Sequence, residues 1–240
     1  MLDTVLDFLR SIKSNELLFF IQLIICLFAQ VAVFRYFGRK GLFAWVAFAA
    51  VVCNIEVSKC VNLFGLSATL GNIFYGSTFL ATDIMSELHG GKEARRSVLL
   101  GFAANILFFV MMWLGLMYIP NEFDVVNGAM HQVFVFLPRL ILASVMAFLI
   151  SNTLDTYSYD LIRKWFPNQL WIRNNGSTMT SQLVDSFLWS FIAFAGVMPV
   201  HELVEISLTT YAIKVIVAAC DTPFLYMVRG IAAKHPELNN

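Results

Sequence analysis

The sequence predicts an all-α integral membrane protein with seven transmembrane helices, on the basis of three observations. First, seven apolar runs are each long enough to cross a bilayer, which takes roughly 20 residues. Second, 59% of the residues are hydrophobic and only 13% are charged, whereas a soluble domain carries about 25% charged residues. Third, Lys and Arg gather in every second loop. Too little polar sequence remains for a separate soluble domain.

The apolar runs define the expected spans in order: 17–36, 42–62, 68–88, 98–119, 132–152, 177–198 and 204–228. Residues 1–16 form an amphipathic lead-in before the first span. That span is too long for a signal peptide, and no small-residue cleavage site follows it, so we expect a retained helix. Residues 229–240 form the tail after the last span. We therefore expect a multi-pass protein without a second domain.

The distribution of basic residues predicts the orientation in the membrane. The loops 120–131 and 199–203 contain neither Lys nor Arg. Basic residues instead follow spans one, three, five and seven: Arg35, Arg39, Lys40, Lys92, Arg95, Arg96, Arg163, Lys164, Arg173, Arg229 and Lys234. Cytoplasmic loops carry the excess of Lys and Arg, so we expect the N-terminus outside and the C-terminus in the cytoplasm.

The second and third spans contain the first candidate site residues. Asp83 and Glu87 are four residues apart and share one face of a helix. Phe79 lies on the same face, within roughly 40° of Asp83. Asn54 is a polar interruption of the second span. A polar stripe of this kind on an apolar helix predicts a side that faces the protein interior.

The last three spans contain the other candidates. Ionisable side chains inside a span are costly and therefore face a partner or a wet cavity. We expect Asp185 and Lys214 to form the centre of a substrate pocket because they lie deepest in their spans. The alternative is that these charges pair only to hold the helices together. Further candidates lie on the polar faces of spans five and six: Arg139, Asn152, Asp155, Gln182 and Trp189.

Local motifs give no support for an enzyme or a bound cofactor. The segment from His201 to Glu205 is similar to a zinc-protease helix, but Glu205 stands where the second histidine ligand is required. Gly90-Gly91-Lys92 lacks the first glycine of a phosphate-binding loop. A lysine in the seventh span is typical of retinal proteins, yet these carry an Asp where this chain has Thr210. We expect no catalysis, no cofactor and no metal site.

Three segments together resemble the queuosine precursor transporter family, also called the VUT family of vitamin-uptake-like transporters. The first runs from Ala81-Thr82-Asp83 to Ala94-Arg95-Arg96. The second combines Arg139 with residues 152–155. The third runs from Ser177-Thr178 through Gln182 to Asp185 and is followed by Lys214. No single segment is specific, but the combination is, and it extends over spans two to seven.

The resemblance implies both an architecture and an activity. Shorter family members begin at the second span, so residues 17–36 would be an extra helix added to a six-helix core at 42–228. That core is similar to the substrate-binding components of energy-coupling-factor importers. The implied activity is uptake of 7-deazaguanine precursors of queuosine, in the cyano or aminomethyl form or as queuine, across the bacterial inner membrane. The alternative is a binding component for another heterocycle or vitamin.

The chemistry of a deazaguanine fits the polar residues on independent grounds. Its adjacent N–H donors suit an ionised Asp, and its carbonyl oxygen needs a donor such as Lys214. Its flat face needs an aromatic wall, for which Phe79 and Trp189 are candidates. The expected partners are this small molecule and the lipid bilayer, with no nucleic acid. The sequence leaves open an energy-coupling partner and a homo-oligomer, because the chain has no ATP-binding motif of its own.

Overall fold

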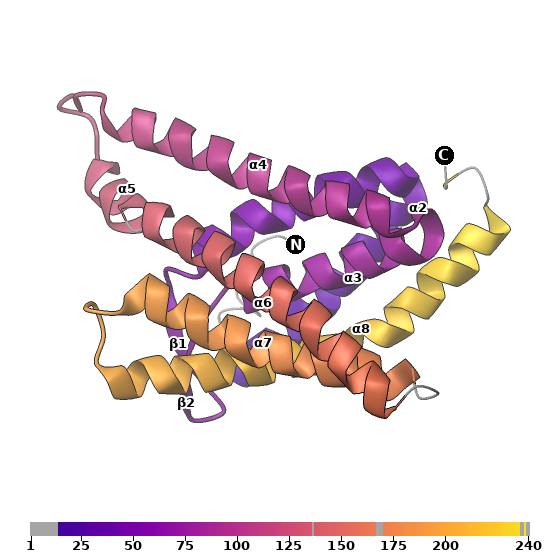
Figure 1. Ribbon diagram of the computed structural model, residues 1–240. Helices are drawn as coiled ribbons and strands as arrows, with labels where there is room; N and C mark the ends of the chain where they lie inside the picture. Colours follow the sequence, from indigo (N-terminus) through magenta and orange to yellow (C-terminus); the bar gives the residue numbers. More distant parts are fainter. Residues whose placement is uncertain (1–13, 136, 167–169, 236–237, 239–240) are drawn as a thin grey trace. The chain divides into compact units, whose positions relative to one another are not determined.

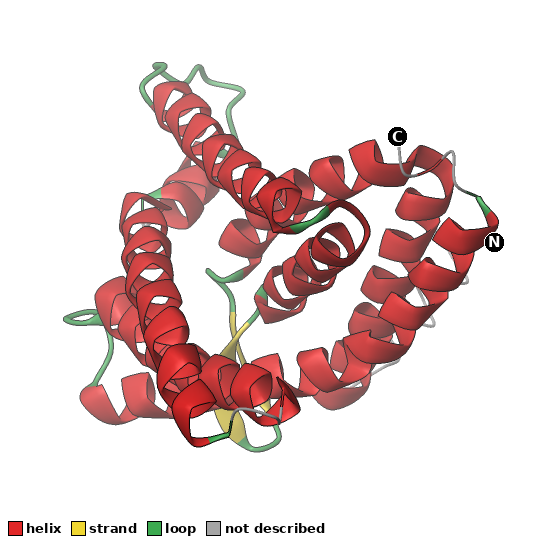
Figure 2. Cartoon of the chain, turned by 45° about the vertical axis from the view of Figure 1, so that its right-hand side comes forward, coloured by secondary structure: helices red, strands yellow, loops and turns green. Residues whose placement is uncertain are grey.

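The computed structural model describes residues 14–135, 137–166, 170–235 and 238, which are mostly helical (Figure 1). A two-stranded hairpin separates the first two helices (Figure 2). The elements in order are α2 (Asn15–Glu56), β1 (Cys60–Leu63), β2 (Leu66–Thr69), α3 (Asn72–His89), α4 (Gly91–Leu116), α5 (Asn127–Phe134), α6 (Leu137–Trp165), α7 (Leu170–Phe194) and α8 (Val200–Lys234).

The chain divides into two compact units. The terminal unit comprises Met1–Phe102 and Val217–Asn240, and the central unit comprises Ala103–Ile216. Both boundaries fall inside helices, so α4 and α8 each contribute residues to both units. The lead-in predicted for residues 1–16 lies almost entirely outside the described residues, since α2 begins at Asn15.

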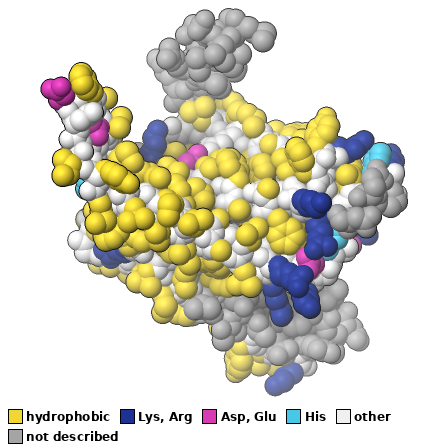
Figure 3. Space-filling model, turned by 90° about the horizontal axis from the view of Figure 1, so that it is seen from above, with side chains coloured by type: hydrophobic (Ala, Val, Ile, Leu, Met, Phe, Trp, Pro, Cys, Tyr) yellow, Lys and Arg dark blue, Asp and Glu magenta, His cyan; other side chains and the backbone are white. Residues whose placement is uncertain are grey.

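Three helical stretches among the described residues are long and apolar enough to cross a membrane: Asn15–Glu56, Gly91–Leu116 and Asn127–Phe148. Large apolar side chains on them are exposed, including Ile25, Leu107 and Trp113. Hydrophobic side chains cover much of the face in Figure 3. Exposed apolar surface of this extent is expected where lipid, not water, surrounds the helices. These are the features of a helical membrane protein, and the seven-span arrangement stays a prediction.

Helix α2 is divided at Gly38, between the two spans predicted for this part of the chain. Gly38 has φ 57° and ψ −141°, which interrupts the helical geometry. A Cβ atom at this position would lie 2.4 Å from the carbonyl oxygen of Leu238. Only glycine combines a positive φ with so close an approach of another backbone segment. The division therefore depends on this residue.

The β1–β2 hairpin differs from the expectation of helix alone. The second span was expected to continue to residue 62, but α2 ends at Glu56 and the strands follow. Phe64 and Gly65 join the strands and both have positive φ, 53° and 77°. Positive φ at both central residues is the geometry of a type I′ turn, which matches the twist of a hairpin. The sequence signal for this turn was weak because Phe64 occupies the first central position, which usually holds Asn, Asp or Gly.

The hairpin is fastened to the start of α2. The backbone N–H of Phe64 donates to Glu16 Oε1 at 3.1 Å, and Asn15 Nδ2 donates to the carbonyl of Asn62 at 2.9 Å. The Phe64 ring also makes an edge contact with Phe19, with ring centroids 6.2 Å apart. These contacts offset the cost of a left-handed Phe backbone, which is about 1–2 kcal/mol.

Helices α2 and α3 share buried polar contacts inside the terminal unit. Trp45 Nε1 donates to Ser77 Oγ at 3.1 Å. The amide of Gln30, oriented to satisfy its neighbours, donates to the carbonyl of Ser77 at 3.1 Å and accepts from the backbone N–H of Ala81 at 2.8 Å. Gln30 and Ser77 are both 0% exposed. The polar atoms of this interface are therefore matched by partners, as buried polar groups require.

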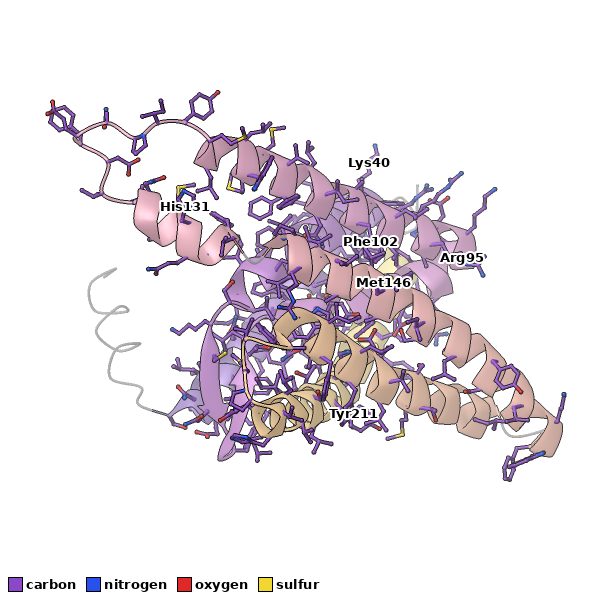
Figure 4. All side chains as sticks on the ribbon, turned by 60° about the vertical axis from the view of Figure 1, so that its left-hand side comes forward. Lys40, Arg95, Phe102, His131, Met146 and Tyr211 are labelled. Atoms are coloured by element: carbon purple, nitrogen blue, oxygen red, sulfur yellow. The ribbon has the colours of Figure 1, made fainter. Side chains whose placement is uncertain are left out.

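Basic residues of the terminal unit gather near the break in α2 and the start of α4. Glu93 accepts from Arg39 Nη2 at 2.6 Å and from Arg96 Nη1 at 2.5 Å, which links the two helices. Lys40 and Arg95 are exposed, and their side chains project outward in Figure 4. Two guanidinium groups sharing one carboxylate leave a net positive surface. This agrees with the basic segments on which the predicted orientation depends.

Candidate functional site

The site is built on α6 and α7, which pack against each other in the central unit. The buried side of α6 consists of Leu140, Ala143, Ala147 and Ser151, all at most 5% exposed. Their spacing of three and four residues places them in one stripe along the helix. Alanine and serine let neighbouring helices approach closely. The stripe thereby brings the Ser151 hydroxyl against the middle of α7.

A buried ion pair joins α7 to α8 at this level. Lys214 Nζ donates to Asp185 Oδ2 at 2.5 Å, and Ser151 Oγ donates to Asp185 Oδ1 at 3.1 Å. Asp185 is 4% exposed, and Lys214 and Ser151 are each 5% exposed. Two helices, α6 and α8, thus supply one donor each to a single carboxylate on α7. Both oxygens of that carboxylate carry a hydrogen bond.

The ion pair is costly to bury and must therefore be explained. Removing a carboxylate and an ammonium from water costs several kcal/mol per ion, and their attraction offsets this only with good geometry and further hydrogen bonds. The short contact and the Ser151 hydroxyl supply these. An apolar pair of similar volume would often be as stable. Stability alone is therefore a weak reason for this pair, whereas charged groups inside a membrane protein typically mark a ligand site.

Buried polar atoms without a partner lie beside the ion pair in sequence. Three buried side-chain atoms of α7 and α8 have no hydrogen-bond partner among the described residues: Gln182 Oε1, Ser190 Oγ and Thr210 Oγ1. Gln182 is one turn from Asp185 on α7, and Thr210 is one turn from Lys214 on α8. Each therefore shares a helix face with one member of the pair. Orphaned buried polar atoms are rare in native proteins and call for an explanation such as an absent ligand.

Arg139 takes a different position from the one expected for a pocket residue. Its Nε donates to the carbonyl of Ile192 at 2.7 Å, and its Nη2 donates to the carbonyl of Ala195 at 2.5 Å. These carbonyls belong to the C-terminal end of α7, where the helix leaves acceptors unsatisfied. An arginine there also complements the negative end of the helix dipole. In the described structure Arg139 thus fixes the end of α7.

Trp189 lies on the same face of α7 as Asp185, one turn nearer to the end of the helix. Its Nε1 donates to Ser144 Oγ of α6 at 3.1 Å, and its ring makes an edge contact with Phe194, with centroids 5.7 Å apart. The indole is thereby held between α6 and α7. A hydrogen bond fixes its orientation, and its role as an aromatic wall stays a prediction.

The remaining predicted residues are distributed as follows. Asp83 and Glu87 are exposed residues of α3 in the terminal unit, and Glu87 Oε1 lies 3.5 Å from Arg229 Nε. Phe79 makes an edge contact with Tyr75 at 5.1 Å. Asn54 is buried and its Nδ2 donates to the carbonyl of Ala50. The side chains of Asn152 and Asp155, both on α6, lie outside the described residues.

Two residues of the cluster were not among the predicted site residues. Ser151 directly precedes Asn152, and its signal was the regular spacing of small residues along α6. Thr210 precedes Lys214 by one turn and is 3% exposed. A hydroxyl in an apolar helix usually bonds to the carbonyl one turn earlier, so sequence gives no hint that this one lacks a partner.

Comparison with known proteins identifies related sequences. The profile of a family described as "Putative vitamin uptake transporter" matches residues 69–228. A protein of Bacillus subtilis named "Probable queuosine precursor transporter" is 43% identical over 82% of this chain and 86% of its own length. The "Queuosine precursor transporter" of Escherichia coli is 26% identical over 69% of this chain and 74% of its own length. No solved structure matches the chain.

Proposed function

Because the chain belongs to the vitamin uptake transporter family, as its three motif segments predicted, we propose that it imports 7-deazaguanine precursors of queuosine. The protein is a transporter and not an enzyme. The names of two relatives support this substrate: one is named a "Probable queuosine precursor transporter" and the other a "Queuosine precursor transporter". The proposal includes the cyano and aminomethyl forms and queuine, and a location in the bacterial plasma membrane.

The observation that carries the proposal is the buried polar cluster around Asp185. The matched family segment contains all three groups of this cluster, Ser151, Asp185 and Lys214. A deazaguanine offers neighbouring N–H donors and a carbonyl acceptor on one edge. The cluster offers a carboxylate, an ammonium group and an unpaired amide oxygen on Gln182. These are complementary sets, in a region otherwise made of apolar helices.

We propose that Asp185 and Lys214 contact the base and that Trp189 covers its flat face. Every group of the ion-pair cluster is at most 5% exposed, so binding requires α6, α7 or α8 to move. Such movement is the usual basis of alternating access, in which helices rock around a fixed site near the bilayer midplane. Asn152 and Asp155, whose side chains are not described, stay predictions for the same helix, α6.

Uptake into liposomes tests this function. The purified full-length protein is reconstituted and supplied with the labelled cyano and aminomethyl compounds. Labelled guanine is the control substrate. We expect uptake of at least one deazaguanine above that of empty liposomes, and no comparable uptake of guanine. Absence of uptake and of binding for every deazaguanine would contradict the function.

The same experiment separates the two energetic alternatives. A secondary carrier accumulates substrate alone and responds to an imposed pH gradient. A substrate-binding component of an energy-coupling-factor importer binds its ligand tightly but needs a separate ATP-driven partner for transport. The buried ion pair between Asp185 and Lys214 favours a carrier, since charged groups inside a membrane protein can couple the movement of protons or ions to that of the substrate.

We also propose the seven-span arrangement with an external N-terminus, in which residues 17–36 are added to a core at 42–228. It is supported by the Lys and Arg distribution, since the exposed loop after Pro120 contains neither residue. A reporter after Asn240 should indicate the cytoplasm, and one at Asn121 the outside. Opposite signals would contradict this orientation.

A further inference from the structure

Two adjacent threonines of α8 show that the unpaired polar atoms beside the ion pair are unusual. Thr209 and Thr210 are both 3% exposed. Thr209 Oγ1 donates to the carbonyl of Glu205 at 2.8 Å, one turn earlier, which is the ordinary way for a helix to satisfy a hydroxyl. Thr210 Oγ1 has no partner among the described residues. The same helix thus satisfies one hydroxyl and leaves its neighbour available to a ligand.

The residues that carry the two unpaired atoms, Gln182 and Thr210, lie on opposite sides of the ion pair along the helices. Helices α7 and α8 are joined by the short segment 195–199 and run in opposite directions (Figure 1). Gln182 precedes Asp185 by three residues, and Thr210 precedes Lys214 by four. At a rise of about 1.5 Å per residue, these positions are separated by about 10 Å along the axis, with the ion pair between them. A ligand that contacts both must have polar groups at its two ends.

The charges of the cluster balance without a ligand. Among the described buried residues of the central unit, Asp185 supplies the sole carboxylate and Lys214 the sole ammonium group. Both oxygens of Asp185 already accept hydrogen bonds, from Lys214 and Ser151. A ligand bearing its own ammonium group would meet no unpaired carboxylate among the described buried side chains of this unit and would approach the charge on Lys214. In a site excluded from water, that repulsion is strong.

We propose that this site selects uncharged flat heterocycles over heterocycles that carry an ammonium group, with Gln182 and Thr210 as the contacts at the two ends of the ligand. Gln182 Oε1 accepts from an N–H donor at one end. The Thr210 hydroxyl donates to an acceptor, such as a nitrile nitrogen, at the other. This inference rests on the proposed function and adds the preferred substrate class: the cyano form binds more tightly than the protonated aminomethyl form.

Direct binding of the two compounds to the purified full-length protein tests the preference. At neutral pH we expect the cyano form to bind at least about tenfold more tightly, which equals about 1.4 kcal/mol. In Lys214→Met the Asp185 carboxylate is left without its cation, so the preference should reverse toward the aminomethyl form. If neither compound binds the wild-type protein, the proposed function fails. If both bind and the aminomethyl form binds as tightly or more tightly, only the selectivity is overturned.

A matched pair of threonine variants keeps the inference testable if Lys214→Met does not fold. Thr210→Val removes a hydroxyl that has no partner, so the melting temperature should stay the same or rise while affinity for the cyano form falls about five- to tenfold. Thr209→Val removes a satisfied hydrogen bond and should leave affinity unchanged. Equal affinities of the two variants for the cyano form would overturn the role of Thr210.

Discussion

The terminal and central units treat buried polar groups in different ways. In the terminal unit, the side chains between α2 and α3 satisfy one another: Gln30 bonds to the backbone of α3, and Trp45 bonds to Ser77. In the central unit, a buried ion pair lies between helix faces that also bear unpaired atoms on Gln182 and Thr210. A satisfied network rigidifies a fold, whereas an incomplete one is a place where a ligand can complete the bonding.

The two units do not differ simply in the number of buried polar atoms that lack a partner. The terminal unit also contains unpaired buried atoms, Thr69 Oγ1 and His89 Nε2. These lie in different elements, β2 and α3, and neither accompanies a buried ion pair among the described residues. The unpaired atoms of Gln182 and Thr210 each lie one turn from a buried charge. We therefore propose that the matched polar groups between α2 and α3 serve structure and that those around Asp185 serve binding.

The largest effect is expected from removing one charge of the ion pair. Asp185→Asn keeps the shape of the side chain but leaves the Lys214 ammonium group buried without a counter-charge. Breaking a buried pair in this way typically costs about 3–5 kcal/mol. The melting temperature in detergent should fall sharply. An unchanged melting temperature would mean that water reaches Lys214 and that the site is open.

A smaller effect is expected at Arg139. Arg139→Met keeps the length of the side chain but removes the donors to the carbonyls of Ile192 and Ala195. Hydrogen bonds from charged groups contribute about 1.5–3 kcal/mol, so stability should fall by about 2 kcal/mol. Ligand affinity of the folded variant should change by less than about threefold. A loss of affinity without a loss of stability would instead return Arg139 to the binding site, where the sequence had suggested it.

The smallest effect is expected in the terminal unit. Gln30→Leu removes a side-chain amide that bonds to Ser77 and Ala81, and the two backbone groups can then pair with each other along α3. Stability should fall by about 1 kcal/mol, as measured by the melting temperature. Ligand affinity should be unaffected. If affinity fell as much as in Thr210→Val, the division between the two units would be wrong.

Sequence patterns predicted much of the helical structure because hydrophobic runs are long and have sharp ends. The break at Gly38 falls in the gap between the two spans predicted at 17–36 and 42–62, whereas α6 continues to Trp165, past the predicted end of the span at residue 152. The hairpin could not be predicted, because its turn depends on a left-handed Phe64 that is held by contacts with Glu16 and Phe19, far away in sequence. The turn lacks the usual Asn-Gly signal.

The candidate site could be predicted in part. Asp185 and Lys214 were identified because isolated charges in apolar spans are costly, and the structure shows them bonded to each other. The spacing of small residues along α6 was a signal for Ser151, but Thr210 had none, because Thr is common in such helices and the sequence does not show which hydroxyls have partners. Arg139 has the same sequence signal as Lys214, but its partners are backbone carbonyls, which no sequence pattern reveals.

Ligand binding to the double variant Asp185→Asn/Lys214→Met tests the central claim most directly. Removing both charges leaves no unpaired ion, so the melting temperature should return close to the wild-type value. Titration calorimetry with the cyano deazaguanine should nevertheless detect no binding at concentrations that saturate the wild-type protein. A stable double variant with wild-type affinity would contradict the account and reduce the ion pair to a link between α7 and α8.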